Sequence, residues 1–172
     1  MRVTIAYAFA ATGLVAVPAA AQEMSLSVEI PRLRVAEYHN PYVAIWIENE
    51  AGRAVRTLDV WYDIDLRGDD PEKWLPDMRT WWRRAGRSMD LPADGISAPT
   101  KAPGTHRQAY RQGSRPLGNL PAGNYTLRVE AAREVGGREV VSLPFQWPPR
   151  ANASATASGD SELGAVRLSL SR

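Results

Sequence analysis

The sequence predicts an all-β protein, an antiparallel immunoglobulin-like β-sandwich with one short helical insertion at about residues 71–85. Three observations support this fold class. Six or seven short segments alternate apolar and polar residues, turn-forming residues separate them, and one stretch has helical spacing. Two adjoining segments within residues 41–61 are apolar on both faces, so each face needs a covering layer.

The first 21 residues have the composition of a secretory signal peptide. Arg2 supplies a positive start, residues 5–17 are almost wholly apolar, and the alanines at 19–21 offer a cleavage site before Gln22. The apolar run is short for a membrane span, and a retained N-terminal anchor is the alternative. We therefore expect residues 22–172 to form a single periplasmic domain that does not itself span the membrane after signal cleavage.

Charge and cysteine content exclude several classes of function. The 172 residues include 21 Lys and Arg against 19 Asp and Glu, which gives a formal net charge of +2, and there is no cysteine. Disulfides, thiol catalysis and a cysteine-linked lipid anchor are therefore excluded. Nucleic-acid binding lacks the basic excess that it requires.

The central element is predicted to be a β-hairpin. Residues 41–48 and 53–61 are rich in β-branched and aromatic residues, and Gly52 ends the tetrapeptide between them. If that tetrapeptide forms the loop, Glu48 faces Arg53 and the remaining register follows by counting. One face then carries Val43, Ile45, Ile47, Ala54, Leu58 and Val60 with Arg56, and the other carries Tyr42, Ala44, Trp46, Val55, Thr57, Asp59 and Trp61.

The remaining strands are predicted from alternation on either side of this hairpin. They span residues 24–30, 105–111, 125–131, 139–147 and 163–170. Residues 88–104 and 150–161 are rich in turn-forming or small residues, so both are expected to be loops, the second a flexible one. The last strand is expected at a sheet edge, beside the first strand.

The helical insertion is predicted from capping signals. Asp70 is placed as an N-cap before Pro71, and Pro76 interrupts this helix but opens a second one that ends before Gly86. The apolar positions on the second helix are Leu75, Met78, Trp82 and Ala85, with Trp81 beside them. This segment is expected to cover the aromatic face of the hairpin.

Two stretches of the sequence resemble known families. The segment PAGNYTLRVEA at residues 121–131 resembles the last hairpin of bacterial immunoglobulin-like modules, including that of flagellar hook-capping proteins. The order EYHNPYVAIWIE, VWYD, KWLPDMRTWW, KAPGTHR, LPAGNYTLRVEAARE and ELGAVRLSL is similar to the exported bacterial family filed as domain of unknown function 2271. A Trp-Asp-Gly turn usually follows the PGT strand in that family, whereas residues 109–113 here read AYRQG.

The second resemblance covers nearly all of the mature chain. It implies a periplasmic protein that is accessory to membrane-bound PepSY-type proteins linked to iron or siderophore uptake. It supplies no catalytic residues to carry over.

No catalytic constellation is recognisable, so we predict no enzyme and no cofactor. The two histidines, His39 and His106, would form a transition-metal site only if the fold brought them together; otherwise His39 caps a strand end and His106 faces solvent. Asp63 and Asp65 begin a calcium-loop pattern that lacks oxygen ligands at Arg67 and Trp74. Helix capping and solvation are the preferred roles for these two acids.

The strongest candidate for a binding surface combines tryptophan and arginine, which protein interfaces favour. The alternative is that these tryptophans only cover the hairpin, although adjacent helical residues point about 100° apart and need not both face inward. Arg133 and Glu134 are placed to line the same end of the sandwich as His39, or to form a surface salt bridge. The full set of candidates is His39, Tyr42, Trp74, Arg79, Trp81, Trp82, Arg83, Arg133 and Glu134.

These features together predict a non-catalytic periplasmic binding or interaction module. Its expected partner is a membrane or envelope protein, of PepSY type or part of an iron- or siderophore-uptake system. The alternative is a periplasmic ligand-binding protein for a metal, haem or siderophore-related cargo, held by His39, His106 and the aromatic face of the hairpin.

Overall fold

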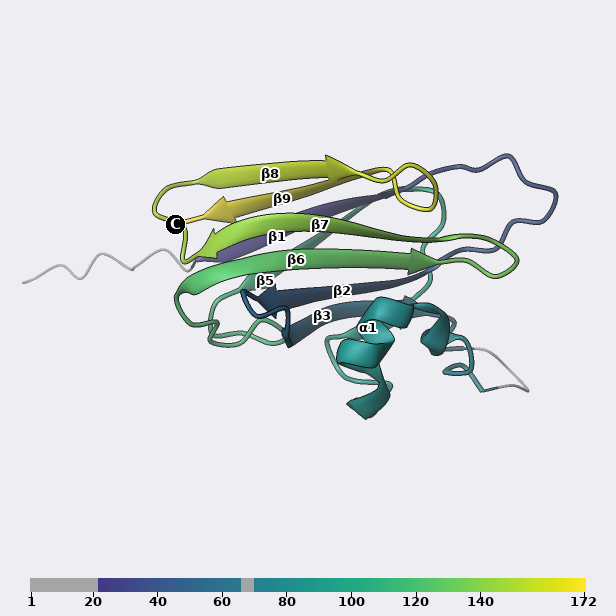
Figure 1. Ribbon diagram of the computed structural model, residues 1–172, viewed down its shortest axis with the longest axis horizontal. Helices are drawn as coiled ribbons and strands as arrows, with labels where there is room; N and C mark the ends of the chain where they lie inside the picture. The colour runs from purple at the N-terminus through teal and green to yellow at the C-terminus, as the bar shows by residue number, and fades with distance from the viewer. Residues whose placement is uncertain (1–21, 66–69) are drawn as a thin grey trace, which may run out of the picture.

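The computed structural model describes residues 22–65 and 70–172, which form two β-sheets packed face to face (Figure 1). The first sheet has the strand order β5-β1-β9-β8, and the second has the order β4-β3-β2-β6-β7. The strands are β1 (Glu23–Ile30), β2 (Tyr42–Asn49), β3 (Ala54–Tyr62), β4 (Ser97–Pro99), β5 (Gly104–Arg111), β6 (Gly123–Ala132), β7 (Arg138–Trp147), β8 (Ala153–Ser158) and β9 (Ala165–Ser171).

The all-β sandwich is therefore confirmed, and its immunoglobulin-like kind stays a prediction. Within the described ranges every strand pair is antiparallel except β3 and β4, which run parallel. The predicted signal peptide lies outside the described residues.

The core between the sheets follows from the alternation of β1. Its apolar residues Met24, Leu26, Val28 and Ile30 are all buried, and they pack against the inward residues of β2 and β6. A second apolar cluster lies on the outer face of the second sheet, where Trp46 and Tyr62 are covered by the helical insertion. The hairpin is thus covered on both faces, as its two apolar sides predict.

The register of this hairpin differs from the predicted one. Glu48 pairs with Ala54, one residue later than predicted, and the pairing shifts twice along β2. The offset at the turn and the two later shifts make three one-residue shifts, and each one turns the side chains that follow it to the opposite face. Trp61 therefore lies between the sheets, and Val60 lies beneath the insertion. The predicted faces of Val60 and Trp61, and likewise of Ala54 and Val55, are therefore wrong. Asp59, predicted on the aromatic face, also lies between the sheets, where it accepts a hydrogen bond from Tyr110.

The insertion contains one short helix, within the range of the second predicted helix, and turns in place of the first. A 3₁₀ turn η1 (Leu75–Asp77), a helix α1 (Arg79–Arg84) and a second 3₁₀ turn η2 (Gly86–Ser88) follow one another. Met78 separates η1 from α1 because its ψ of 66° is not helical. Asp70 does cap the start of the insertion, since its Oδ1 accepts a hydrogen bond from the backbone of Glu72 at 2.9 Å.

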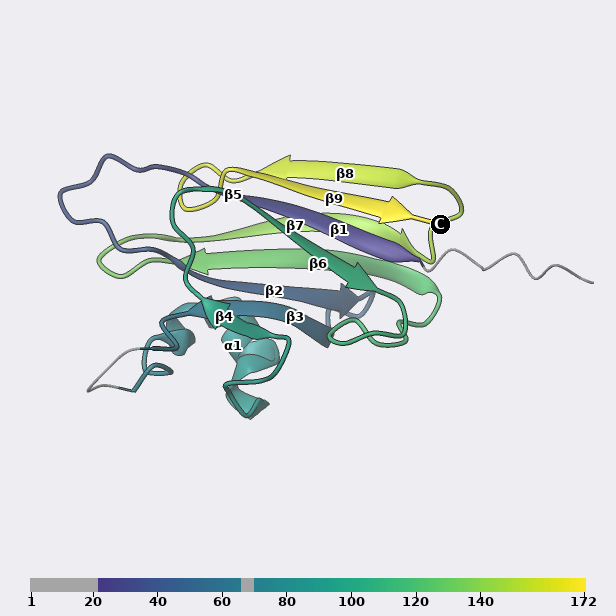
Figure 2. The same cartoon turned by 180° about the vertical axis from the view of Figure 1, so that it is seen from behind.

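Two segments predicted to be loops contain strands. Ser97–Pro99 forms β4 at one edge of the second sheet, and Ala153–Ser158 forms β8 at one edge of the first (Figures 1 and 2). In β8 the alternation between apolar and polar residues involves small residues only. Ala155 and Ala157 pack against the core, while Ser154, Thr156 and Ser158 are exposed. β9 pairs with β1 as predicted, but β8 and not β9 forms the edge.

One end of the sandwich gathers the segments that form the site described below. The link between β1 and β2, the turn between β6 and β7, and the insertion all reach this end, on the right in Figure 1. The turn between β6 and β7 is held to the loop between β8 and β9 by Arg133, whose Nε and Nη2 donate to Glu162 at 2.9 and 3.1 Å.

Candidate functional site

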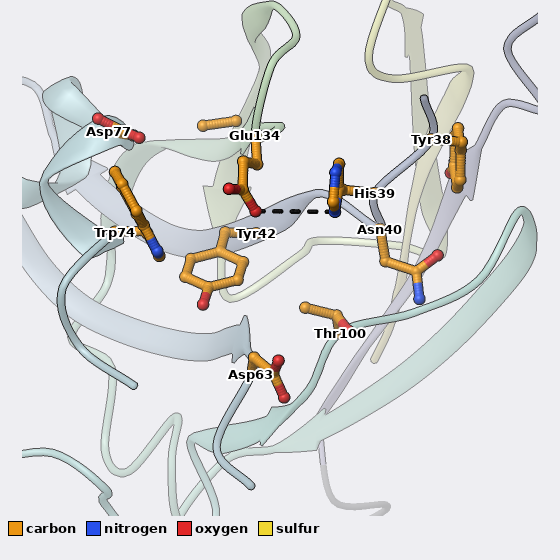
Figure 3. Close-up of a pocket in the computed structure, with 10 residues that line it drawn as sticks. Tyr38, His39, Asn40, Tyr42, Asp63, Trp74, Asp77, Thr100 and Glu134 are labelled. Carbon is orange, nitrogen blue, oxygen red and sulfur yellow. Dashed lines mark ion pairs between the residues drawn. The ribbon is translucent and has the colours of Figure 1, made fainter. Parts of the chain in front are cut away.

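A cleft of about 490 Å³ lies at this end of the sandwich (Figure 3). Its lining comes from the link before β2, the ends of β2, β3, β4 and β6, and the insertion. The lining residues are Tyr38, His39, Asn40, Tyr42, Asp63, Trp74, Asp77, Thr100, Ala132 and Glu134.

Strand pairing and the anchored insertion explain how this cleft forms. Tyr42 is the first residue of β2 and pairs with Ala132, the last residue of β6. The cleft therefore lies at the edge of the sheet where β2 begins and β6 ends. Leu75 and Met78 are fully buried against the outer face of the second sheet and anchor the insertion there. Trp74, which precedes that anchor, remains 38% exposed and borders the cleft.

The cleft carries an excess of acidic side chains. Asp63, Asp77 and Glu134 line it, whereas none of its described lining residues is Lys or Arg. His39 is held among acids as well, with Nε2 at 2.9 Å from Glu37 Oε1 and Nδ1 at 3.7 Å from Glu134 Oε2, the pair marked in Figure 3. A chain with a positive net charge therefore has a locally negative surface here.

Three aromatic side chains complete the cleft wall. Burial raises the pKa of Tyr42, although a hydrogen bond with the backbone of Asp63 opposes that rise. Burial also raises the pKa of Tyr38, with the nearby Arg133 charge opposing it. Both hydroxyl groups therefore stay protonated at neutral pH, and that of Tyr42 can donate a hydrogen bond. The Tyr38 oxygen is buried and has no hydrogen-bond partner within the described ranges.

The structure brings four of the nine predicted candidates to this one cleft: His39, Tyr42, Trp74 and Glu134. Asp63, a predicted metal candidate, lines it too. Arg79 and Arg133 border an adjoining groove of about 590 Å³, which shares Trp74, Asp77, Ala132 and Glu134 with the cleft.

The remaining tryptophan and arginine candidates do not form one surface with Trp74. Trp81 is fully buried in the cluster beneath the insertion, and its Nε1 donates to Thr57 Oγ1 at 3.2 Å. Trp82 is half-buried against Trp81, with ring centroids 6.2 Å apart, and Arg83 is exposed. For Trp81 the alternative of interior packing is therefore the correct one.

The predicted surface pair of Arg133 and Glu134 does not form. The Arg133 side chain is only 6% exposed and makes a buried ion pair with Glu162, which is 4% exposed. Glu134, the next residue, turns outward and faces His39. The prediction that Glu134 shares an end of the sandwich with His39 is correct, and the surface salt bridge is not.

The weak metal candidates do not converge. His106 Nε2 lies 2.8 Å from the Ala102 carbonyl oxygen, and its ring meets Trp61 edge-on, so it shares no partner with His39 in the described ranges. Asp65 is exposed and does not line the cleft. No group of three or more His, Cys, Asp or Glu side chains in the described part of the chain could hold a metal ion. The middle of the predicted calcium loop lies outside that part.

Sequence reasoning misses several residues of the cleft, including Tyr38, Asp77 and Thr100. Asp77 carries no sequence signal because a single aspartate next to a proline is common in turns. Tyr38 and Asn40 flank His39 in a polar, aromatic run before β2, and that run is the signal which could identify this wall of the cleft.

Fold and site together define a β-sandwich protein with an acidic, aromatic cleft at one end. Residues 23–165 match the model of family DUF2271, described as a predicted periplasmic protein, and the chain belongs to this family. The protein is periplasmic by that description. No curated protein and no solved structure matches the chain. The described residues contain no helix that is long and apolar enough to cross a membrane.

Proposed function

We propose that this periplasmic protein is a non-catalytic interaction module whose cleft receives a segment of a membrane or envelope partner. One observation carries this role: four separately predicted binding candidates, His39, Tyr42, Trp74 and Glu134, line a single cleft. Aromatic side chains in a concave surface are what binding sites for proteins and ligands favour. The family resemblance supports a PepSY-type partner linked to iron or siderophore uptake.

The chemistry of the cleft favours binding over catalysis. His39 contacts the carboxylates of Glu37 and Glu134, and no serine or threonine hydroxyl is its partner within the described residues. A histidine held in this way is not set to activate a hydroxyl nucleophile. The protonated Tyr42 hydroxyl is suited to donate a hydrogen bond to a bound group.

Site-specific photo-crosslinking in cells tests this function. A photoreactive residue replaces Trp74 at the cleft, and in a matched control it replaces Ser154, which is exposed on β8 of the other sheet. We expect a discrete crosslinked partner from position 74 and none from position 154, with the partner identified by mass spectrometry. No adduct at position 74, or the same adducts at both positions, would rule out the cleft as the docking site.

A second candidate is a ligand-binding protein for a metal, haem or siderophore-related cargo. The observation that favours it is that the imidazole of His39 lies in the same cleft as the rings of Tyr42 and Trp74, which suits a haem or siderophore-related cargo better than a bare metal ion, since no three metal-ligating side chains of the described residues come together. Native mass spectrometry of the protein released from the periplasm tests it. A bound mass that is lost in His39→Ala supports the cargo, and an unliganded mass in the wild type argues against it.

A further inference from the structure

The acidic side chains of the cleft have few ion-pair partners. Three of the buried glutamates outside it are paired with arginine. Glu48 contacts Arg84 and Arg128, Glu130 contacts Arg138, and Glu162 contacts Arg133. In the cleft, neither Asp63 nor Asp77 has an ion-pair partner among the described residues, and Glu134 reaches only His39, at 3.7 Å.

The aromatic rings of the cleft, like its carboxylates, can attract a positive charge. The face of an aromatic ring attracts a positive charge. Two of the three rings already contact a cation of this chain: Lys73 Nζ lies 4.9 Å from the Trp74 ring centre, and Arg133 Cζ lies 5.9 Å from that of Tyr38. Tyr42 has no such cation in the described ranges, although its ring meets Tyr62 edge-on at 6.3 Å.

Tyr42 also has the central position in the cleft. Figure 3 shows its ring between Trp74 and Thr100, with Glu134 on one side and Asp63 on the other. A positive charge over this ring would therefore lie among carboxylates that no basic residue of the described lining neutralises.

We propose that the cleft recognises the ammonium or guanidinium group of a lysine or arginine side chain on a partner polypeptide. This inference rests on the proposed function, because it specifies the chemistry of the segment that the cleft receives. The long apolar stem of such a side chain packs against Tyr42 and Trp74 while its charged end meets Asp63, Asp77 and Glu134.

The adjoining groove favours a polypeptide over a small free amine. It continues from the cleft through Trp74, Asp77 and Glu134, so the two depressions together accommodate an extended segment. Arg79, Arg133 and Arg138 also line the groove, so the basic side chain of that segment belongs in the cleft and not in the groove. Val135, on the wall of this groove, is 77% exposed and offers an apolar contact. A free amine would use the cleft alone and leave the groove empty.

Titration of the purified protein with defined probes, followed by NMR shifts of backbone amides, tests the inference. The probes are blocked tripeptides Ala-Lys-Ala, Ala-Arg-Ala and the neutral Ala-Gln-Ala, together with spermidine as a free amine. We expect the two basic peptides to shift amides near Tyr42, Trp74 and Glu134, with an affinity that falls as salt rises. The neutral peptide is expected to shift none of them.

Charge-neutralising variants give the quantitative result. We expect Asp63→Asn and Asp77→Asn each to weaken binding of the lysine peptide about threefold, and Tyr42→Leu to weaken it a further few-fold, on the order of threefold, through loss of the ring. The matched control is Arg83→Gln, an exposed charge change on α1 outside the cleft, which should leave binding unchanged. Circular dichroism confirms that each variant is folded.

Three outcomes would overturn the inference. These are equal binding of the neutral peptide, unchanged affinity for Ala-Lys-Ala in a variant that combines Asp63→Asn with Asp77→Asn, or spermidine binding as tightly as Ala-Lys-Ala. If crosslinking at position 74 still captures a partner while the basic peptides fail to bind, the interaction function stands and only the cation recognition falls.

Discussion

The backbone amide of Trp81 donates a hydrogen bond to Glu130 Oε2 at 2.7 Å, which joins the first turn of α1 to the middle of the second sheet. The other oxygen of Glu130 accepts from the Thr80 amide at 3.0 Å and from Arg138 Nη1 at 2.6 Å. A fully buried carboxylate thus satisfies amides that the helix itself leaves without partners. It holds in place the insertion that carries Trp74 and Asp77 to the cleft.

Glu130→Gln is expected to destabilise the protein by about 2 kcal/mol, because the charge-assisted hydrogen bonds are replaced by weaker neutral ones. Urea denaturation followed by tryptophan fluorescence measures this change. The control is Glu50→Gln, where the exposed side chain keeps an acceptor for Asn124 and the expected change is below about 0.5 kcal/mol. Equal effects of the two substitutions would show that Glu130 does not anchor the insertion.

The sequence predicts some strands better than others, because the difference in hydropathy between neighbouring residues varies from strand to strand. In β1, Leu26 and Val28 alternate with serines, and burial follows that alternation. In β8, alanine alternates with serine and threonine, which differ too little in hydropathy to mark a buried face. In β3, counting from the turn assigns Trp61 to the wrong face because a bulge in the pairing has no sequence signal.

Some residues of the site were predictable from the sequence, but their assembly was not. Residue type alone identifies His39, Tyr42, Trp74 and Glu134 as binding candidates. Their meeting depends on the pairing of β2 with β6 and on the docking of the insertion, both of which are long-range contacts. Sequence patterns describe local structure, so a cleft made from distant segments cannot be read from them.

The buried ion pair of Arg133 and Glu162 gives a test by double substitution. Glu162→Leu is expected to cost about 3–5 kcal/mol because it leaves the Arg133 charge buried and unpaired. The double variant Arg133→Met with Glu162→Leu is expected to recover most of that loss, since no buried charge remains. Denaturation midpoints of Arg133→Met, Glu162→Leu and the double variant measure the coupling. If the losses are simply additive, the two side chains do not act as a pair.

Asp59 and Tyr110 give a pH-dependent prediction between the sheets. Burial raises the pKa of Asp59, and hydrogen bonds from Tyr110 and Trp61 oppose the rise. A carboxyl whose pKa is raised on folding adds stability at low pH, and this contribution is lost as the pH rises through the folded-state pKa.

Tyr110→Phe removes one of these donors and leaves the carboxylate less well solvated. The variant is expected to lose about 1–3 kcal/mol at a pH where Asp59 is charged, and less at lower pH once the carboxyl is protonated. Denaturation at several pH values measures the loss. A loss that does not depend on pH would mean that Tyr110 acts through packing alone.

Glu139 is expected to show the opposite dependence on pH. Partial burial acts to raise its pKa, but backbone hydrogen bonds from Asp160, Leu163 and Ser161 outweigh that effect and hold the pKa below its usual range. A lowered pKa adds stability above the ordinary glutamate range, and this contribution is lost as the pH falls through the folded-state pKa.

Glu139→Gln should therefore destabilise the protein by about 1 kcal/mol or less at neutral pH, because the carboxylate is partly exposed. The difference from wild type should close as the pH falls from about 7 to about 3. Urea midpoints across this range measure it, and Glu37→Gln, at an exposed residue of the link before β2, serves as the control. If the gap between Glu139→Gln and wild type stays constant or widens in acid, the hydrogen bonds from the loop between β8 and β9 do not depend on the charge of Glu139.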